Sequence, residues 1–321
     1  MPAHYKTAES VSPHHPDKLC DQISDAILDA YLTGDAQARV AVETVGGHGK
    51  VFVVGEVTAI FHPEIEPIVA RIAGDVEVEM RLVKQSPEIA QGVDAGGVGD
   101  QGIMVGYACD ETPELLPLET MLSRQLNQYL YALWPYDGKT QVTLKDGLIC
   151  SVVASFQNAP SAELQKAVAT WLHDHDHVPE VEKHVNPAGD WELGGFDADT
   201  GLTGRKLVVD NYGPSIPIGG GCFSGKDPSK VDRSAAYMAR QIARDYLQNR
   251  GAHEVFCYLA YAIGYDQPLE ATVIVDGVQE SITGYDLSPR GIADYLQLKR
   301  PIYEKTARYG HFGHGEFSWE Q

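Results

Sequence analysis

The chain has 321 residues, of which 43% are hydrophobic and 22% are charged, an ordinary composition for a globular protein of two or three domains. No apolar run approaches the roughly 20 residues of a membrane-spanning helix, and the first residues lack the pattern of a secretory signal. The formal net charge of −20 argues against binding to nucleic acid or to an anionic membrane. A bound polyanion would therefore need cations gathered in one place.

The five cysteines are scattered along the chain, and no two are spaced C-x-x-C. An odd, dispersed set argues against a disulfide framework or a zinc site and indicates a reducing compartment. We therefore expect a cytoplasmic protein.

The first predicted element is a helix over residues 16–34. Pro16 suits the first helical position, and Gly34 ends an apolar stripe with helical spacing. Four aspartates also recur every four residues along this helix: Asp17, Asp21, Asp25 and Asp29. We interpret the last two as a solvated acidic face.

Hairpins and helices then alternate along the chain. The predicted elements are strands 39–44 and 51–60, helix 63–73, a glycine-rich mobile loop 91–102, helix 114–133, strands 140–144 and 148–156, helix 162–173, strand 206–210, helix 228–249, and strands 255–263 and 271–275. The mixture predicts an α+β fold with sheets covered on one face. Boundaries near 100 and 195 give three domains: residues 1–100, 101–194 and 195–321.

A basic, glycine-rich segment stands out in this acidic chain. Residues 220–226 fit the pattern G-x-x-x-x-G-K, whose backbone N–H groups and lysine suit phosphate oxygens. Asp227 follows where a P-loop needs Ser or Thr, so a phosphotransferase or NTPase of the P-loop class is disfavoured. A purely structural turn is the other alternative. The spacing of Lys226, Lys230 and Arg233 predicts a cationic row that forms a phosphate bed at a helix start.

The opening of the first helix carries a second polar group, His14-His15-Pro16-Asp17-Lys18. An imidazole and a carboxylate beside a helix N-terminus can hold a phosphate and its magnesium together. Metalloprotease and serine-hydrolase motifs are absent, and no cysteine stands in a nucleophile motif. A reaction whose nucleophile arrives with the substrate would need none of these.

Seven motifs, in order and spacing, resemble those of the S-adenosylmethionine synthetases, and the resemblance runs from residue 4 to the end. The motifs are Glu9–Ser12, His15–Lys18, Gln85–Pro87 with Gln91–Asp94, Gly99–Gly102, Gly201–Lys206, Gly219–Lys230 and Tyr309–Gly313. The resemblance implies three similar β/α domains about a pseudo-threefold axis. It also implies a loop near residues 91–100 that gates the site, and homodimers with shared active sites within a homotetramer.

The same resemblance implies the site residues. Contacts to ATP are implied for His15, Asp100, Lys139, Trp191, Asp199, Arg205, Lys206, Cys222 and Lys226. Contacts to L-methionine are implied for Glu56, Gln91, Asp199 and Lys230. Two Mg²⁺ ions per site would be held by Asp17 and Asp232, and K⁺ by Glu43. The catalytic cations and donors would be His15, Arg205, Lys206 and Lys226.

The implied reaction is attack of the methionine sulfur on C5′ of ATP, followed by hydrolysis of tripolyphosphate to phosphate and pyrophosphate. A thioether has no proton to lose, so the reaction needs alignment and charge stabilisation rather than a base. Two departures from the family pattern are a shorter loop before Asp100 and Asp190 in place of an arginine, which would put a negative charge near the nucleotide. They leave open an alternative, a nucleotide-binding paralogue that acts as a regulatory subunit.

Overall fold

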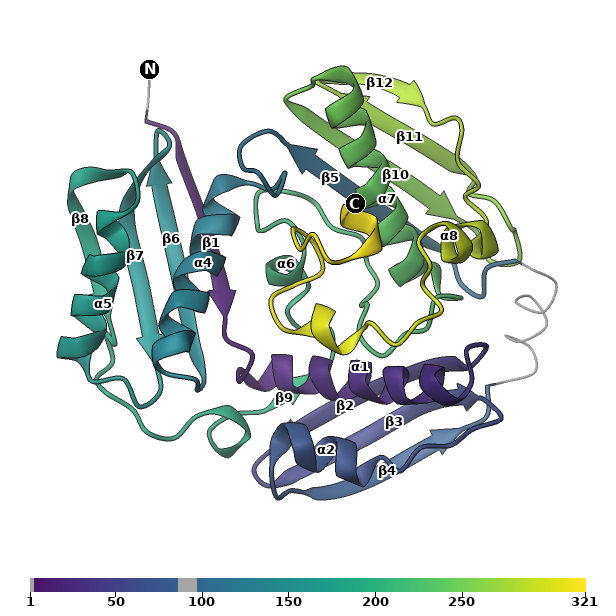
Figure 1. Ribbon diagram of the computed structural model, residues 1–321, viewed down its shortest axis with the longest axis horizontal. Coiled ribbons are helices and arrows are strands. Elements are labelled where there is room, and N and C mark those ends of the chain that lie inside the picture. Colours follow the sequence, from purple (N-terminus) through teal and green to yellow (C-terminus); the bar gives the residue numbers. More distant parts are fainter. Residues whose placement is uncertain (1–2, 86–96) are drawn as a thin grey trace.

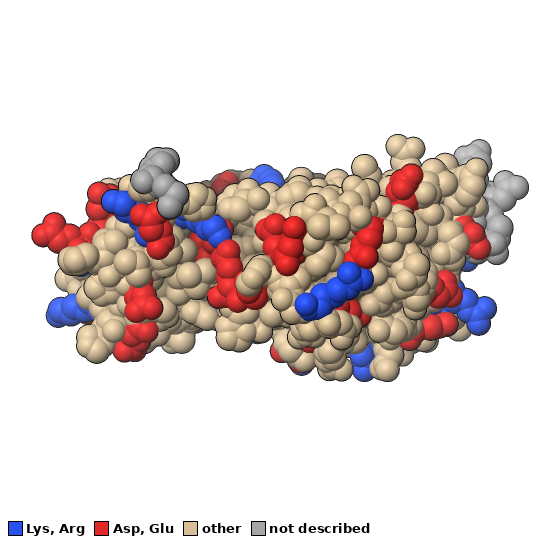
Figure 2. Space-filling model, turned by 90° about the horizontal axis from the view of Figure 1, so that it is seen from above, with Lys and Arg blue, Asp and Glu red and all other residues tan. Residues whose placement is uncertain are grey.

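The computed structural model describes residues 3–85 and 97–321, and three four-stranded sheets form its framework (Figure 1). The sheets lie around a central region that holds the C-terminal segment. Seen from above, the molecule is a flat slab on which acidic and basic side chains are interspersed (Figure 2). Among the described residues, no helix is both long and apolar enough to cross a membrane.

The first sheet has the order β4-β3-β2-β9 and is covered on one face by α1 and α2. β2 and β3 form an antiparallel hairpin, whereas β4 runs parallel to β3. The elements are α1 (Pro16–Gly34), β2 (Arg39–Gly47), β3 (Lys50–Thr58), α2 (Glu66–Ala73), β4 (Glu77–Val83) and β9 (Gly201–Leu202).

The second sheet, β1-β6-β7-β8, repeats this arrangement of a hairpin, a helix and a parallel strand. β1 pairs with the hairpin strand β6, and α4 and α5 pack on one face. The elements are β1 (Tyr5–Val11), α4 (Leu118–Leu133), β6 (Gly138–Lys145), β7 (Leu148–Phe156), α5 (Ser161–His173) and β8 (His177–Val185).

The third sheet, β12-β11-β10-β5, is antiparallel throughout and packs against α7. Gly251 ends α7 in the left-handed conformation, with φ 60° and ψ 38°, as glycine commonly does after a helix. The elements are β5 (Gly102–Cys109), α7 (Val231–Arg250), β10 (Glu254–Tyr261), β11 (Glu270–Val275), β12 (Val278–Ser281) and α8 (Pro289–Tyr295).

The remaining helical turns are η1 (Gly195–Asp197), α6 (Leu207–Asp210), η2 (Glu304–Ala307) and η3 (Ser318–Glu320). These elements confirm the predicted α+β class with sheets covered on one face.

The sheets nevertheless exchange strands across the expected domain boundaries. β1 joins the central sheet, β5 joins the C-terminal sheet, and β9 returns to the N-terminal sheet.

The strand predicted at 206–210 was wrong, because Leu207–Asp210 forms the short helix α6. Tertiary contacts override the β-branched pair Val208-Val209 here. The Asp210 side chain turns inward and accepts a hydrogen bond from Lys18 Nζ at 2.6 Å. This buried pair fixes the segment that follows the predicted phosphate cations.

The C-terminal segment packs into the centre between the three sheets (Figure 1). Tyr303, Phe312 and Trp319 are fully buried, and Trp319 stacks on Tyr237 of α7 with ring centroids 3.8 Å apart. Glu320 is also buried and binds Arg240 at 2.9 Å. The segment therefore contacts two helices, α1 through η2 and α7 through η3.

Candidate active site

His15 caps the N-terminus of α1, and its Nδ1 accepts the backbone N–H of Asp17 at 3.1 Å. Burial, together with the charges of Lys206 and Lys139, lowers the pKa of His15 to about 3. The imidazole is therefore neutral at physiological pH. Because Nδ1 is an acceptor, the proton lies on Nε2, which is available to donate to a phosphate oxygen.

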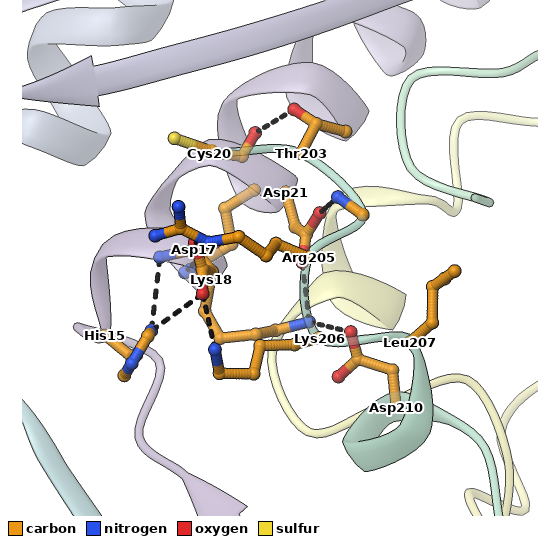
Figure 3. A network of polar contacts seen from close by, with 12 residues as sticks. His15, Asp17, Lys18, Cys20, Asp21, Thr203, Arg205, Lys206, Leu207 and Asp210 are labelled. Carbon is orange, nitrogen blue, oxygen red and sulfur yellow. Dashed lines mark hydrogen bonds and ion pairs between the residues drawn. The ribbon is translucent and has the colours of Figure 1, made fainter. Parts of the chain in front are cut away.

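Asp17 is buried and binds both cations of the neighbouring loop (Figure 3). Arg205 Nε lies 2.7 Å from one carboxylate oxygen and Lys206 Nζ lies 2.5 Å from the other. The backbone N–H of Leu202 donates to the same carboxylate at 3.0 Å. Burial opposes ionisation of Asp17, but the bonds from Lys206 and Leu202 hold its pKa below the usual value. The ionised carboxylate thus holds the cations together.

A second buried carboxylate lies one turn further along α1. Lys18 Nζ sits between Asp21, at 3.0 Å, and Asp210, at 2.6 Å, and all three side chains are almost fully buried (Figure 3). Asp21 also accepts the backbone N–H of Gly204 at 2.8 Å. Burial raises the pKa of Asp21 to about 6, and the charge of Lys18 opposes that rise.

A second group of predicted residues forms around Lys226, whose Nζ lies 2.6 Å from Asp232 Oδ2. Burial opposes the charge on Lys226, but Cys222, Asp232 and Glu43 raise its pKa. The loop that carries Lys226 runs beside β2, where Val42 donates its backbone N–H to Gly225 O at 3.0 Å. The chain therefore divides the predicted phosphate cations between two groups, one at Asp17 and one at Asp232.

The predicted cationic row was wrong, because α7 begins at Val231 and its first turn points Arg233 inward. Arg233 is fully buried and makes two hydrogen bonds to Asp25, at 2.7 and 2.9 Å. Lys230 forms an ion pair with Asp227. Of the three cations, only Lys226 belongs to the group around Asp232.

The solvated face predicted for Asp25 and Asp29 was also wrong. Asp25 is fully buried against Arg233. Asp29 is half-buried and accepts the backbone N–H groups of Tyr303 and Glu304 at 2.9 Å. These partners come from segments far along the chain, so helical spacing alone could not reveal them.

Glu43 and Glu56 lie on the open face of the first sheet. Glu43 pairs with Val54 and Glu56 with Ala41, whereas the alternate residues of β2 and β3 are buried toward α1. Ala41 forms a bridge to Lys226, which places the Lys226 loop at the edge of this face. Gln91, the other implied methionine contact from this part of the chain, lies outside the described residues.

The remaining implied nucleotide residues come from three segments: Lys139 lies at the start of β6, Trp191 and Asp199 lie on either side of η1, and Asp100 precedes β5. The buried Nε1 atom of Trp191 lacks a hydrogen-bond partner among the described residues. Burial raises the pKa of Asp137, whose carboxylate accepts the backbone N–H of Gly195 at 3.1 Å. The charge of Lys139 opposes this rise and the charge of Asp199 adds to it, so both side chains lie near Asp137. Asp100 is exposed and accepts the backbone N–H of Gln101 at 2.7 Å.

The Asp190 side chain binds the start of α5. Its Oδ1 atom accepts hydrogen bonds from the hydroxyl and the backbone N–H of Ser161, the first residue of α5, and from Asn186. These bonds lower the pKa of Asp190. The carboxylate thus caps a helix whose preceding residue, Pro160, makes no cap of its own.

The P-loop interpretation does not fit the structure. No described strand leads into residues 219–226, and the helix that follows begins at Val231 rather than at Lys226. A P-loop requires a strand before its glycines and a helix that starts at its lysine.

The carboxylates fit magnesium bound together with a nucleotide. Mg²⁺ usually takes one or two protein carboxylates and completes its shell with substrate phosphates and water. Among residues 3–85 and 97–321, no group of three or more metal-binding side chains stands ready to hold an ion alone. Asp17 and Asp232 each lie beside a lysine, Lys206 and Lys226 respectively.

Sequence reasoning missed three buried groups that support these loops. Lys18, Asp21 and Asp25 bind the backbone or the counter-charges of the cation-bearing segments. The four-residue spacing of the aspartates was the available signal. Asp17, Asp21 and Asp25 lie on one face of α1 and are all buried. Buried carboxylates need partners on another segment, but the sequence did not show which residues those partners are.

Comparisons with known proteins agree on one family. Models of the S-adenosylmethionine synthetase N-terminal, central and C-terminal domains match residues 3–92, 95–191 and 193–321. The chain is 42% identical to the S-adenosylmethionine synthase of Treponema denticola over 371 aligned positions, which cover 99% of this chain and 95% of the relative.

The synthases of Rhodospirillum centenum and Bifidobacterium adolescentis are also 42% identical, with 98% of this chain and 95% of each relative covered. These alignments span 369 and 384 positions, more than the 321 residues of the chain, so the relatives carry segments without a counterpart here. The three domain matches and the full-length relatives place this chain in the S-adenosylmethionine synthetase family.

Proposed function

We propose that this protein forms S-adenosylmethionine from ATP and L-methionine and hydrolyses the released tripolyphosphate to phosphate and pyrophosphate. The observation that carries this proposal is the group of His15, Asp17, Arg205 and Lys206 at the start of α1, in which His15 and Asp17 are buried and the two cations reach toward solvent. It combines a neutral donor, an ionised carboxylate and two cations on adjacent residues. Family membership adds support, since the relatives are named as synthases.

The charge arrangement suits a reaction with a polyphosphate leaving group. The methionine sulfur needs no base, whereas the departing triphosphate gains negative charge that must be stabilised. Each well-placed donor to such charge is typically worth about 3–4 kcal/mol in a dry site. His15 Nε2–H, Arg205, Lys206 and Lys226 are the groups that we assign to this role, with Lys139 beside them.

Binding of triphosphate would change the partners of these cations. In the structure, Arg205 and Lys206 form ion pairs with Asp17, and Lys226 forms one with Asp232. Phosphate oxygens would take over the cations, which would leave both carboxylates free for Mg²⁺. Bound Mg²⁺ supplies charge neutralisation and activation of water, and we assign two ions to Asp17 and Asp232 and K⁺ to Glu43.

We assign the adenine contact to Trp191, further nucleotide contacts to Asp100, Asp199 and Cys222, and methionine to Glu56, Gln91, Asp199 and Lys230. We further propose that two copies share each active site within a dimer, and that dimers pair into a tetramer. The division of the cations between Asp17 and Asp232 supports this, since a second copy can complete each group.

Product analysis tests the proposal. The protein is incubated with ATP, methionine, Mg²⁺ and K⁺. A methionine-dependent sulfonium product with phosphate and pyrophosphate is expected. Formation of ADP would indicate a phosphotransferase instead, and nucleotide binding without any product would indicate a regulatory paralogue. The intact set of cations and carboxylates disfavours the paralogue.

A further inference from the structure

The aspartates of α1 form a ladder in which the four carboxylates accept backbone N–H groups from three distant segments, residues 202–204, residue 225 and residues 303–304. The bonds run from Leu202 to Asp17 at 3.0 Å, from Gly204 to Asp21 at 2.8 Å, from Gly225 to Asp25 at 2.8 Å, and from Tyr303 and Glu304 to Asp29 at 2.9 Å. Residues four apart share one face of a helix, so a single rigid element fixes all of these segments.

Asp21 and Asp25, the two middle aspartates, bind loops of similar sequence, Thr203-Gly204-Arg205 and Ser224-Gly225-Lys226. In both loops the anchored glycine directly precedes a proposed triphosphate cation. Gly204 and Gly225 also adopt nearly the same left-handed backbone, with φ of 76° and 79°. A side chain is excluded at both, because a Cβ would lie 2.4 Å from Cys222 Cβ or 1.9 Å from Val42 O.

Both Asp21 and Asp25 have a buried cation beside them, and the one beside Asp21, Lys18, is shared with Asp210. Lys18 Nζ lies 3.0 Å from Asp21, and Arg233 binds Asp25 through both guanidinium nitrogens. Arg233 also donates to the backbone carbonyl of Lys226 at 3.1 Å. The hydrogen bonds from Gly204 to Asp21 and from Gly225 to Asp25 are therefore charge-assisted, and each carboxylate is also bound by a cation. These contacts restrict movement of both loops.

We propose that Asp21 and Asp25 are positioning residues, which set the Arg205–Lys206 loop and the Lys226 loop for triphosphate. The inference rests on the proposed function, because it takes these cations as the triphosphate ligands. When phosphate draws Arg205 and Lys206 away from Asp17, the Asp21–Gly204 bond still holds their backbone. Cations kept in place in this way need little reorganisation as charge develops on the leaving group.

The test compares Asp21→Asn and Asp25→Asn with Asp29→Asn. Asp29 is the matched control, since it anchors backbone N–H groups from the same helical face, but its segment carries none of the proposed site cations. Tripolyphosphate affinity is measured by calorimetry in EDTA, and kcat, KM for ATP and Tm are measured for each variant. We expect the first two variants to lose roughly tenfold or more in tripolyphosphate affinity, and Asp29→Asn to stay within about twofold.

Removing a buried charge can unfold the chain. Asp21→Asn leaves Lys18 paired with Asp210, 2.6 Å away, whereas Asp25→Asn leaves Arg233 without a carboxylate. The double variant Arg233→Met/Asp25→Asn therefore accompanies Asp25→Asn, and it is expected to regain Tm while affinity stays low. Recovery of affinity along with Tm would overturn the proposal, as would equal losses in all three single variants. Wild-type protein that makes no sulfonium product would instead refute the proposed function.

Discussion

Lys226 Nζ and Asp232 Oδ2 lie 2.6 Å apart, in a pair whose side chains are 19% and 18% exposed. The contact joins the proposed phosphate cation to the carboxylate proposed for Mg²⁺. The two opposite charges neutralise each other. In the proposed complex, triphosphate would bind the lysine and Mg²⁺ would bind the carboxylate, so each member of the pair would exchange one partner of opposite charge for another.

Lys226→Ala should lower kcat by roughly 10²–10³-fold, because one donor to the leaving triphosphate is lost. The lysine is not part of the buried core, so Tm should change little. Lys166→Ala, an exposed lysine on α5, is the control and should keep wild-type turnover. Steady-state kinetics give kcat for both variants, and thermal unfolding gives Tm. Near-normal turnover of Lys226→Ala would remove the lysine from the catalytic set.

Local signals in the sequence were sufficient for much of the fold. The helix predicted at 16–34 has those bounds in the structure, because Pro16 and Gly34 mark its ends independently of tertiary contacts. The hairpin at 39–60 was likewise recognisable from its β-branched runs and glycine turn. Pairings over long distances were not recognisable. β1 and β5 join sheets formed by later segments, and only the folded chain brings those strands together.

The candidate site shows the same division. The sequence predicted His15, Asp17, Arg205 and Lys206 as individual site residues. The structure shows that Asp17 contacts the other three. The supporting layer beneath them was not predicted. Asp25 meets Arg233 across 208 positions, and no local pattern separates such a pair from two solvated charges. Burial of a charge depends on the whole fold, so its role appeared only in three dimensions.

The glycines of the 219–225 loop should differ sharply in tolerance to alanine. Gly225→Ala would place a Cβ 1.9 Å from Val42 O at a φ of 79°, so the loop must shift or the chain unfold. We expect a loss of about 2–4 kcal/mol in the free energy of unfolding. At Gly220 no atom lies within 4 Å of a Cβ, and Gly220→Ala should cost under about 1 kcal/mol. Denaturant unfolding of both variants tests this contrast, and equal losses would contradict it.

Asp29 should make stability depend on pH between about 4 and 7. Burial raises its pKa in the folded chain to about 6, above the ordinary aspartate value of 3.8. The native state therefore binds a proton that the unfolded state releases, and this contribution to stability is lost as pH rises through 6. The free energy of unfolding of wild type minus that of Asp29→Asn should fall by about 2 kcal/mol between pH 4.5 and 7.5.

Urea titrations of the two proteins at the two pH values measure this difference. Other titrating groups are common to both proteins, so their contributions cancel in the subtraction. A difference that stays flat, or that grows as pH rises, would show that the carboxyl is not shifted upward in the native state.

Asp190 and Trp191 are neighbours in sequence with separable roles. Asp190→Ala removes the acceptor that caps α5, so Tm should fall while KM for ATP stays at the wild-type value. Trp191→Ala removes the proposed adenine contact, and KM for ATP should rise roughly tenfold or more. The measurement is KM for ATP at saturating methionine beside Tm for each variant. Because the buried indole N–H of Trp191 has no partner among the described residues, its loss leaves no hydrogen bond unpaired in the free protein. If Asp190→Ala raised KM as Trp191→Ala does, the carboxylate would act on the nucleotide after all, and its role as a helix cap would be secondary.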